Sequence, residues 1–247
     1  MRRLAACLAG LLLGLTSLAG CGDSSSSKTI TVFAASSLTE VMAELDTRYQ
    51  QTHRGMTVRT SFGGSQDLVA QLKDGKPADV LVTADVQSMN EARKLTGESR
   101  TIAHNSMTIA VAPGNPKHIQ GVADLADPRL RVVLGAPTTP SGRYALQVFT
   151  KAGVTVVPKS EEIDVRSVLT RVRTGEADAG IVYITDIKSA GAAASSVPIP
   201  AAQNVTAAYP AAVLEKSGHQ DQAKTFVAWL TSAEGLAILT KYGFITH

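Results

Sequence analysis

The sequence contains very little cysteine, with only Cys7 and Cys21 among its 247 residues. Because both lie near the amino terminus, the rest of the chain can form no disulfide and offers no thiol to a metal. The stability of the domain must therefore come from a hydrophobic core. About 220 residues are enough for one large domain or two smaller lobes.

Aromatic residues and clustered charge are also scarce. Aromatic residues make up 4% of the chain, and the formal net charge is only +3. No stripe of basic residues is present, which argues against nucleic acid as a partner. The five histidines are scattered in polar contexts and show no metal-ligand spacing, so no metal site is expected.

The amino terminus has the features of a bacterial lipoprotein signal. Arg2 and Arg3 precede an apolar run, 4–18, that is too short for a transmembrane helix. Leu18-Ala19-Gly20-Cys21 resembles a lipobox, in which the cysteine carries a diacylglyceryl, palmitate-type lipid. We expect a signal peptide over 1–20, and a lipid anchor with a Ser-rich tether over 21–27. An ordinary secretory signal with a chance cysteine is the alternative, and both place the domain outside the cytoplasm.

From residue 29 onward, strand and helix patterns alternate, which predicts an α/β fold with largely parallel sheets. A strand stopped by Pro113-Gly114 is expected at 107–112, and 190–196 is expected to be a surface loop. The other segments with strand or helix patterns are 29–35, 37–50, 56–62, 66–73, 79–83, 86–95, 130–134, 144–151, 154–157, 165–174, 180–185, 197–200, 211–214 and 221–242. Several strand–helix units in each half favour two lobes with a cleft between them.

Small and hydroxylic residues mark several of the expected helix starts. The stretches are Ala34-Ala35-Ser36-Ser37, Phe62-Gly63-Gly64-Ser65 and Thr138-Thr139-Pro140-Ser141-Gly142, and Glu162-Ile163-Asp164-Val165 opens a fourth helix. A helix start has unpaired N–H groups and the positive end of the helix dipole, so it can bind an anion. Convergence of such starts would surround an anion with neutral donors.

A simpler interpretation exists for each serine taken alone. Ser37-Leu38-Thr39-Glu40 matches a capping box, and Ser65 can cap its own helix. The set of starts favours an anion site more than any one of them does. Asp79 and Asp85 are expected to cap loops rather than to bind metal or catalyse.

Five motifs in order resemble the periplasmic molybdate-binding proteins, and the resemblance covers the chain from residue 28 to 247. The motifs are Thr31-Val32-Phe33-Ala34-Ala35-Ser36-Ser37-Leu38-Thr39, Ser61-Phe62-Gly63-Gly64-Ser65, Pro77-Ala78-Asp79-Val80-Leu81-Val82-Thr83-Ala84-Asp85, Asp164-Val165-Arg166 with Gly180-Ile181-Val182-Tyr183, and Lys241-Tyr242-Gly243-Phe244. The resemblance implies a two-lobed, type II periplasmic-binding-protein fold, each lobe a mostly parallel sheet flanked by helices, with the ligand in the interlobe cleft.

The resemblance also implies a set of ligand-binding residues: Ser37, Ser65, Ser141, Val165 and Tyr183. The serines would donate hydroxyl or backbone hydrogens, Val165 its backbone N–H and Tyr183 its phenol. Ser36 replaces Ser37 if the register slips by one, and the family often has alanine at the position of Ser141. The ligand would be molybdate, or the nearly isosteric tungstate, held without a cofactor or a metal counter-ion.

The same resemblance sets the expected lobes and partners. Lobe 1 would comprise 28–106 and 211–247, and lobe 2 would comprise 107–210. The protein would be a monomeric binding protein that delivers its ligand to the permease and ATPase subunits of an ABC importer, anchored to the cell membrane through the lipid on Cys21.

Three alternatives remain at this point. The first is a receptor for another oxyanion, such as sulfate or phosphate. The second is an extracellular hydrolase, although no Gly-x-Ser-x-Gly or His-Glu-x-x-His motif is present. The third is an adhesin or structural lipoprotein. We expect a binding protein and not an enzyme.

Overall fold

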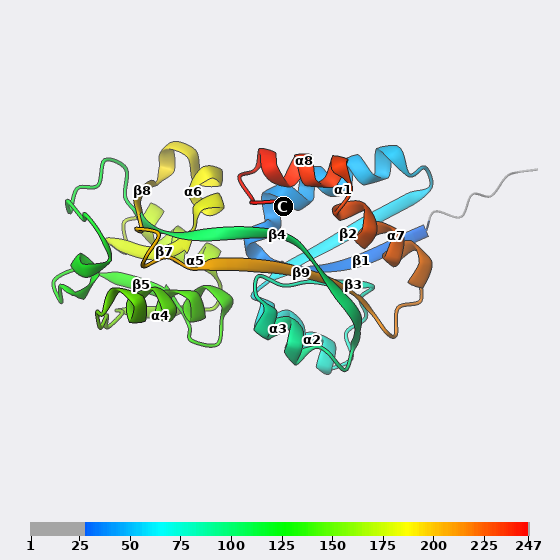
Figure 1. Ribbon diagram of the computed structural model, residues 1–247, viewed down its shortest axis with the longest axis horizontal. Helices are drawn as coiled ribbons and strands as arrows, with labels where there is room; N and C mark the ends of the chain where they lie inside the picture. The colour runs from blue at the N-terminus through cyan, green and yellow to red at the C-terminus, as the bar shows by residue number, and fades with distance from the viewer. Residues whose placement is uncertain (1–27, 247) are drawn as a thin grey trace, which may run out of the picture.

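The computed structural model describes residues 28–246 (Figure 1). The predicted signal peptide, Cys21 and the tether lie outside these residues. The strands are β1 (Lys28–Ala35), β2 (Met56–Gly63), β3 (Val80–Val82), β4 (Thr96–Val111), β5 (Val132–Gly135), β6 (Ser160–Glu162), β7 (Ala179–Tyr183), β8 (Ser195–Pro198) and β9 (Thr206–Leu214). The helices are α1 (Thr39–Thr52), α2 (Ser65–Lys73), α3 (Val86–Glu91), α4 (Pro140–Ala152), α5 (Val165–Arg173), α6 (Ile184–Ala190), α7 (Gln220–Leu230) and α8 (Ala233–Lys241), with short 3₁₀ turns at Ser36–Leu38, Val122–Ala126 and Gly191–Ala193. The α/β class is as predicted.

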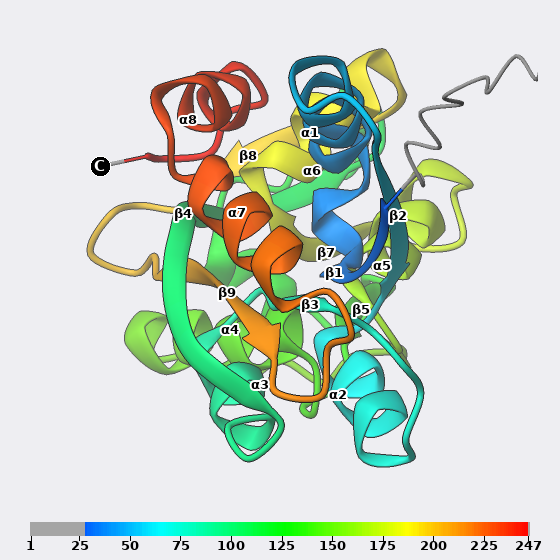
Figure 2. The same ribbon diagram turned by 90° about the vertical axis from the view of Figure 1, so that its right-hand side faces the viewer.

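The strands form two groups joined by two long strands. Their hydrogen-bonded order is β2-β1-β3-β9-β4-β7-β5-β6, with β8 also paired to β4. The first group occupies the right half of Figure 1, between α1, α7 and α8 on one face and α2 and α3 on the other. The second group occupies the left half, between α6 and α4. Figure 2 shows the first half from its end, with β4 and β9 running back into the second.

The sheets are mixed, which corrects the prediction that each would be mostly parallel. β1 pairs in parallel with β2 and β3, and β5 does so with β6 and β7. All pairings of β4 and β9 are antiparallel. The reason is topological, because β4 carries the chain from the first group to the second and β9 brings it back beside β4.

Two local predictions were wrong and a third was incomplete. The strand predicted at 107–112 is present, but it is only the end of β4, which begins at Thr96. The segment 154–157 is not a strand, and β6 pairs with β5 a few residues later, at Ser160–Glu162. The expected loop 190–196 contains the end of α6, a 3₁₀ turn and the start of β8.

The core explains why the patterned segments adopt these elements. The apolar face of α1, including Val41, Met42, Leu45 and Tyr49, is buried against the first strand group. Strand β1 is buried on both faces over its last four residues, as expected for a central parallel strand. No helix in residues 28–246 is long and apolar enough to cross a membrane.

Candidate functional site

A small cavity lies where the carboxyl ends of the parallel strands of both groups meet. β1, β2 and β3 lead into its lining on one side, and β5, β6 and β7 on the other. Its lining residues are Ala35, Ser36, Ser37, Gly63, Gly64, Ser65, Ala84, Thr139, Pro140, Ser141, Asp164, Val165 and Tyr183. The cavity measures about 20 Å³, and on this scale a single water needs roughly 10–15 Å³. The space therefore suits a small ion and excludes a drug-sized molecule.

All five residues expected to bind a ligand line this one cavity. Ser37, Ser65, Ser141, Val165 and Tyr183 are each less than 7% exposed. They come from five different strand–helix junctions, separated by up to 146 positions in the chain. Ser36 lies beside Ser37 in the lining, so the cavity contains both alternatives. The geometry brings the predicted set together, while its role toward a ligand stays a prediction.

The hydroxyl of Ser37 does not cap a helix. Ser36–Leu38 form a 3₁₀ turn after β1, and neither this turn nor α1 has a side-chain cap. The capping box that the sequence suggested at Ser37 is therefore wrong. The Ser37 Oγ instead lies 3.1 Å from the hydroxyl of Tyr209, a buried residue of β9.

Ser65 is also free of the capping role. The cap position of α2 is Gly64, which has no side-chain cap, and the Ser65 Oγ instead accepts the Ala84 N–H at 3.0 Å. Gly64 is required by close approach, because a Cβ there would lie 2.7 Å from the Ile163 carbonyl oxygen across the cavity. Gly64 and Ser65 thus both contribute to the cavity, as the Gly63-Gly64-Ser65 stretch of the sequence indicated.

The start of α4 presents Ser141 to the cavity. Thr139 is the cap, and its Oγ1 accepts the Gly142 N–H at 3.0 Å and donates to the Ala136 carbonyl at 2.8 Å. Pro140 occupies the first helical position, which has no N–H to satisfy. The Ser141 N–H has no acceptor within the helix at this position. Thr139 and Ala84 line the cavity but were not singled out as site residues from the sequence.

Val165 opens α5 and Tyr183 ends β7. The cap of α5 is Asp164, whose carboxylate accepts the Ser167 N–H, so the Val165 N–H has no acceptor within its helix. The Tyr183 hydroxyl is completely buried and has no hydrogen-bond partner among residues 28–246. Burial, and then the neighbouring Tyr209, raise the pKa of Tyr183 well above its ordinary value, so the phenol is a neutral donor.

Among residues 28–246, no cationic side chain lines the cavity, and Asp164 is the one charged residue in the lining. The two nearest arginines in sequence to lining residues are already paired: Arg143 with Asp85, and Arg166 with Glu40. A ligand here would meet serine and tyrosine hydroxyls and helix-start N–H groups. Such a set suits an anion that accepts hydrogen bonds and needs no counter-ion.

The described residues form no metal site, and the two aspartates singled out from the sequence have structural partners. Residues 28–246 contain no group of three or more histidine, cysteine or acidic side chains placed to hold a metal ion. Asp85 caps α3 by accepting the Ser88 N–H, as expected. Asp79 accepts the Thr31 N–H and the Ser217 hydroxyl, and so it organises loops.

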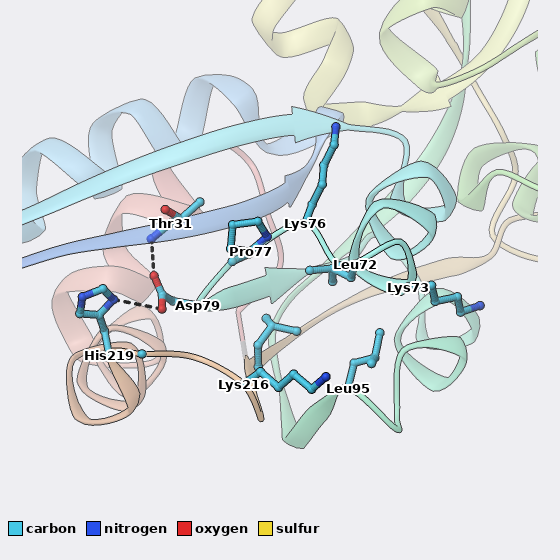
Figure 3. Close-up of a pocket in the computed structure, with 13 residues that line it drawn as sticks. Thr31, Leu72, Lys73, Lys76, Pro77, Asp79, Leu95, Lys216 and His219 are labelled. Carbon is cyan, nitrogen blue, oxygen red and sulfur yellow. Dashed lines mark hydrogen bonds and ion pairs between the residues drawn. The ribbon is translucent and has the colours of Figure 1, made fainter.

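A larger cavity of about 440 Å³ lies near the other end of β1 and β3 (Figure 3). Its polar centre is Asp79, which is engaged by Thr31 and His219. The side chains of Lys73 and Lys76 point in different directions in Figure 3 and do not converge on one point. The cavity near the serines is therefore the better candidate site.

An α/β scaffold with a donor-lined, ion-sized cavity at its strand ends defines a substrate-binding protein of the periplasmic type. Residues 30–245 match the family described as bacterial extracellular solute-binding protein, and the chain belongs to that family.

Sequence and structure comparisons agree with this membership. The molybdate-binding protein ModA of Mycobacterium tuberculosis H37Rv is 37% identical over 90% of this chain and 87% of its own length. The Azotobacter vinelandii periplasmic molybdate-binding protein has a TM-score of 0.74 at 22% identity, covering 88% of this chain and 99% of that one. The sulfate-binding protein SubI of M. tuberculosis has a TM-score of 0.80 at 22% identity, covering 88% and 86%. The last two structures share the fold of this chain. The related proteins are binding proteins and not enzymes, as predicted.

Proposed function

We propose that the protein binds molybdate, and also tungstate, outside the cytoplasm and delivers it to the permease and ATPase of an ABC importer. The observation that carries this proposal is the buried, unpartnered Tyr183 hydroxyl in an ion-sized cavity that also holds Ser37, Ser65, Ser141 and Val165. A buried hydroxyl without a partner is costly, and an oxyanion supplies the acceptor. The similarity to ModA over most of the chain supports molybdate as that ion.

The donor chemistry sets the expected selectivity. Molybdate, tungstate and sulfate are fully deprotonated dianions near neutral pH and can accept a bond from every donor, whereas phosphate carries at least one proton. A buried O–H that finds no acceptor costs about 1–3 kcal/mol. Sulfate is smaller than molybdate, so a closed site sized for molybdate would stretch its hydrogen bonds.

Calorimetric titration of the purified domain with the four anions at fixed ionic strength tests the proposal. We expect tight and similar binding of molybdate and tungstate, much weaker sulfate and almost no phosphate. Sulfate binding as tight as molybdate would reassign the protein as a sulfate receptor. No binding of any of the four, with steady turnover of an ester or peptide, would make it a hydrolase.

Closure of two lobes would trap the ion, and we propose lobe 1 as 28–106 with 211–247, and lobe 2 as 107–210. The change of partner along β4 supports this division, because Thr96 to Ser106 pair with β9 whereas Met107 to Val111 pair with β7. Only a closed state offers donors from both lobes, so the ligand favours closure. The paired strands β4 and β9 would form the hinge.

The protein would act as a monomer held at the cell membrane by lipid on Cys21. The lipobox-like Leu18-Ala19-Gly20-Cys21 supports the anchor, and the family's extracellular placement is consistent with it. Tethering would raise the local concentration of the loaded protein near its importer.

A further inference from the structure

Two buried residues outside the cavity are linked to Ser37 by a chain of hydrogen bonds. Tyr209 of β9 and Asn105 of β4 are both completely buried, and neither lines the cavity. The Tyr209 hydroxyl lies 3.1 Å from the Ser37 Oγ and 3.4 Å from the Asn105 Nδ2. The chain therefore runs from the strands of the proposed hinge to a proposed ligand residue.

The direction of this chain follows from the amide of Asn105. Its Oδ1 accepts the Ser106 N–H at 2.9 Å, which fixes which side of the amide is oxygen. The Nδ2 therefore faces Thr185 Oγ1, at 2.8 Å, and the Tyr209 hydroxyl. Since an amide nitrogen can only donate, the Tyr209 oxygen is an acceptor in this contact.

The consequence passes on to Ser37. Burial raises the pKa of Tyr209, so its phenol keeps its single hydrogen. With its oxygen accepting from Asn105, that hydrogen is directed to the Ser37 Oγ. Ser37 thus accepts from Tyr209, and its own hydrogen is left to point into the cavity.

Ser65 has the same polarity, whereas Ser141 differs. The Ser65 Oγ accepts the Ala84 N–H, which leaves the Ser65 hydrogen free. The Ser141 Oγ lies 3.3 Å from Thr139 Oγ1, whose hydrogen is already donated to the Ala136 carbonyl. Ser141 is therefore the donor in this contact, and its hydrogen is directed to Thr139 and not into the cavity. Asp164 also lines the cavity as an acceptor, and its carboxylate is occupied in part by the Ser167 N–H.

We propose that Asn105 and Tyr209 are specificity-determining residues that orient Ser37 as a donor, so that the cavity favours fully deprotonated anions over protonated ones. The proposal rests on oxyanion binding at this site. A serine hydroxyl that could rotate would donate to a bare dianion and accept from a protonated one. The Asn105–Tyr209 chain occupies one of the two lone pairs of the Ser37 oxygen and so favours donation into the cavity before the ligand arrives.

Tyr209→Phe tests the proposal because it keeps the ring and removes only the hydroxyl. We expect molybdate affinity to fall roughly tenfold and the ratio of phosphate to molybdate dissociation constants at pH 7 to shrink by a similar factor. Tyr49→Phe is the matched control, since Tyr49 is equally buried but packs on Phe226 and Trp229. It should bind all anions as the wild type does.

A double-mutant cycle separates this role from general packing. In a Ser37→Ala background the Tyr209→Phe change should have no further effect on molybdate affinity, because the group it orients is gone. Asn105→Leu should reproduce the loss of selectivity, with circular dichroism and thermal unfolding confirming that each variant folds.

Two results would overturn the inference. One is an unchanged phosphate-to-molybdate ratio in folded Tyr209→Phe, and the other is full additivity with Ser37→Ala. Failure of the proposed function is distinct, because the wild type itself would then show no molybdate binding.

Discussion

The guanidinium of Arg143, in the first turn of α4, lies 2.6 Å from the carboxylate of Asp85, which caps α3. The Arg143 Nη2 also donates to the Ser88 hydroxyl at 2.8 Å. The side chains of Arg143 and Asp85 are only 15% and 6% exposed. Under the proposed division this ion pair joins lobe 2 to lobe 1 close to the cavity, two residues from Ser141 and one from Ala84.

Arg143→Met should therefore loosen closure. Removing the arginine leaves the Asp85 carboxylate buried without its partner, a cost that opening of the lobes relieves. We expect molybdate to dissociate roughly tenfold faster or more, with a nearly unchanged association rate. Stopped-flow displacement with excess tungstate measures the dissociation rate, and direct mixing with molybdate measures the association rate.

The pair Arg166–Glu40 provides a comparison, since it also joins the two lobes but both side chains are more than a third exposed. Glu40→Gln should change the dissociation rate less, and added salt should remove the difference, because exposed pairs contribute little and are screened. Equal dissociation rates for wild type and Arg143→Met would show that the buried pair does not hold the lobes together.

Tyr183→Phe should lower affinity without lowering stability. The phenol makes no hydrogen bond to residues 28–246, so folding loses none when it is removed, while binding loses a donor to a charged ligand. The expected loss is about 1.5–3 kcal/mol, or about ten- to a hundredfold in dissociation constant. Calorimetry and thermal unfolding of the same sample test both parts. A variant that binds as the wild type does would exclude Tyr183 from the site.

Asp186 should make the folded protein less stable as the pH rises. Burial is the largest effect and raises the pKa of Asp186 from 3.8 to about 7. The hydrogen bond from the Tyr183 N–H and the positive charge of Arg166 oppose this rise. The negative charges of Glu40 and Asp164 add to it. Because the folded-state pKa is the higher one, the folded protein binds the proton more tightly than the unfolded chain. The contribution of Asp186 to stability is therefore greatest below about pH 4. It falls by on the order of 4 kcal/mol between about pH 4 and 7 and is level above that.

Asp186→Asn tests this dependence, since its amide oxygen can still accept the Tyr183 N–H. The variant should gain stability relative to wild type at pH 8 and little below about pH 4, as measured by urea unfolding. Asp46 has a pKa raised to about 6, chiefly by burial, and contributes a slope of the same sign. Asp46→Asn is therefore the control, because it should keep the part of the pH dependence of stability that comes from Asp186. Parallel pH profiles for wild type and Asp186→Asn would contradict the prediction.

Cys21→Ala should abolish lipid attachment, because the sulfur that would carry the diacylglyceryl group is gone. We expect an unprocessed or released protein on membrane fractionation, with loss of label from a radioactive fatty acid. Cys7→Ala, in the segment that the peptidase would remove, should leave both unchanged. A Cys21→Ala variant that stays membrane-bound and labelled would refute the lipoprotein interpretation.

The site residues could be predicted because a local sequence pattern marks each of them. Each sits at a strand-to-helix junction marked by serine, glycine or a cap residue, and the topology of parallel strands then brings such junctions to one edge. The first half of β4 was missed because Gly97, Glu98 and Arg100 interrupt any apolar pattern, although pairing with β9 makes this segment a strand. β6 is three polar residues, Ser160–Glu162, and only its pairing with β5 defines it.

The supporting contacts of the site could not be predicted from the sequence. Tyr209 follows Ser37 by 172 positions and Arg143 follows Asp85 by 58, so no local pattern links either pair. The capping interpretations of Ser37 and Ser65 failed for the same reason. A distant acceptor or donor, and not the adjacent helix, occupies each hydroxyl.

The place of β9 has a consequence for the order in which the chain can fold. β9 lies between β3 and β4 in the first strand group, yet it is the last strand in the sequence. Until residue 214 has been synthesised, β3 and β4 have no common neighbour and that sheet remains split. The segment that forms β5 to β8 needs no later strand, so it can assemble first, and a chain truncated before Thr206 should retain structure in that half alone.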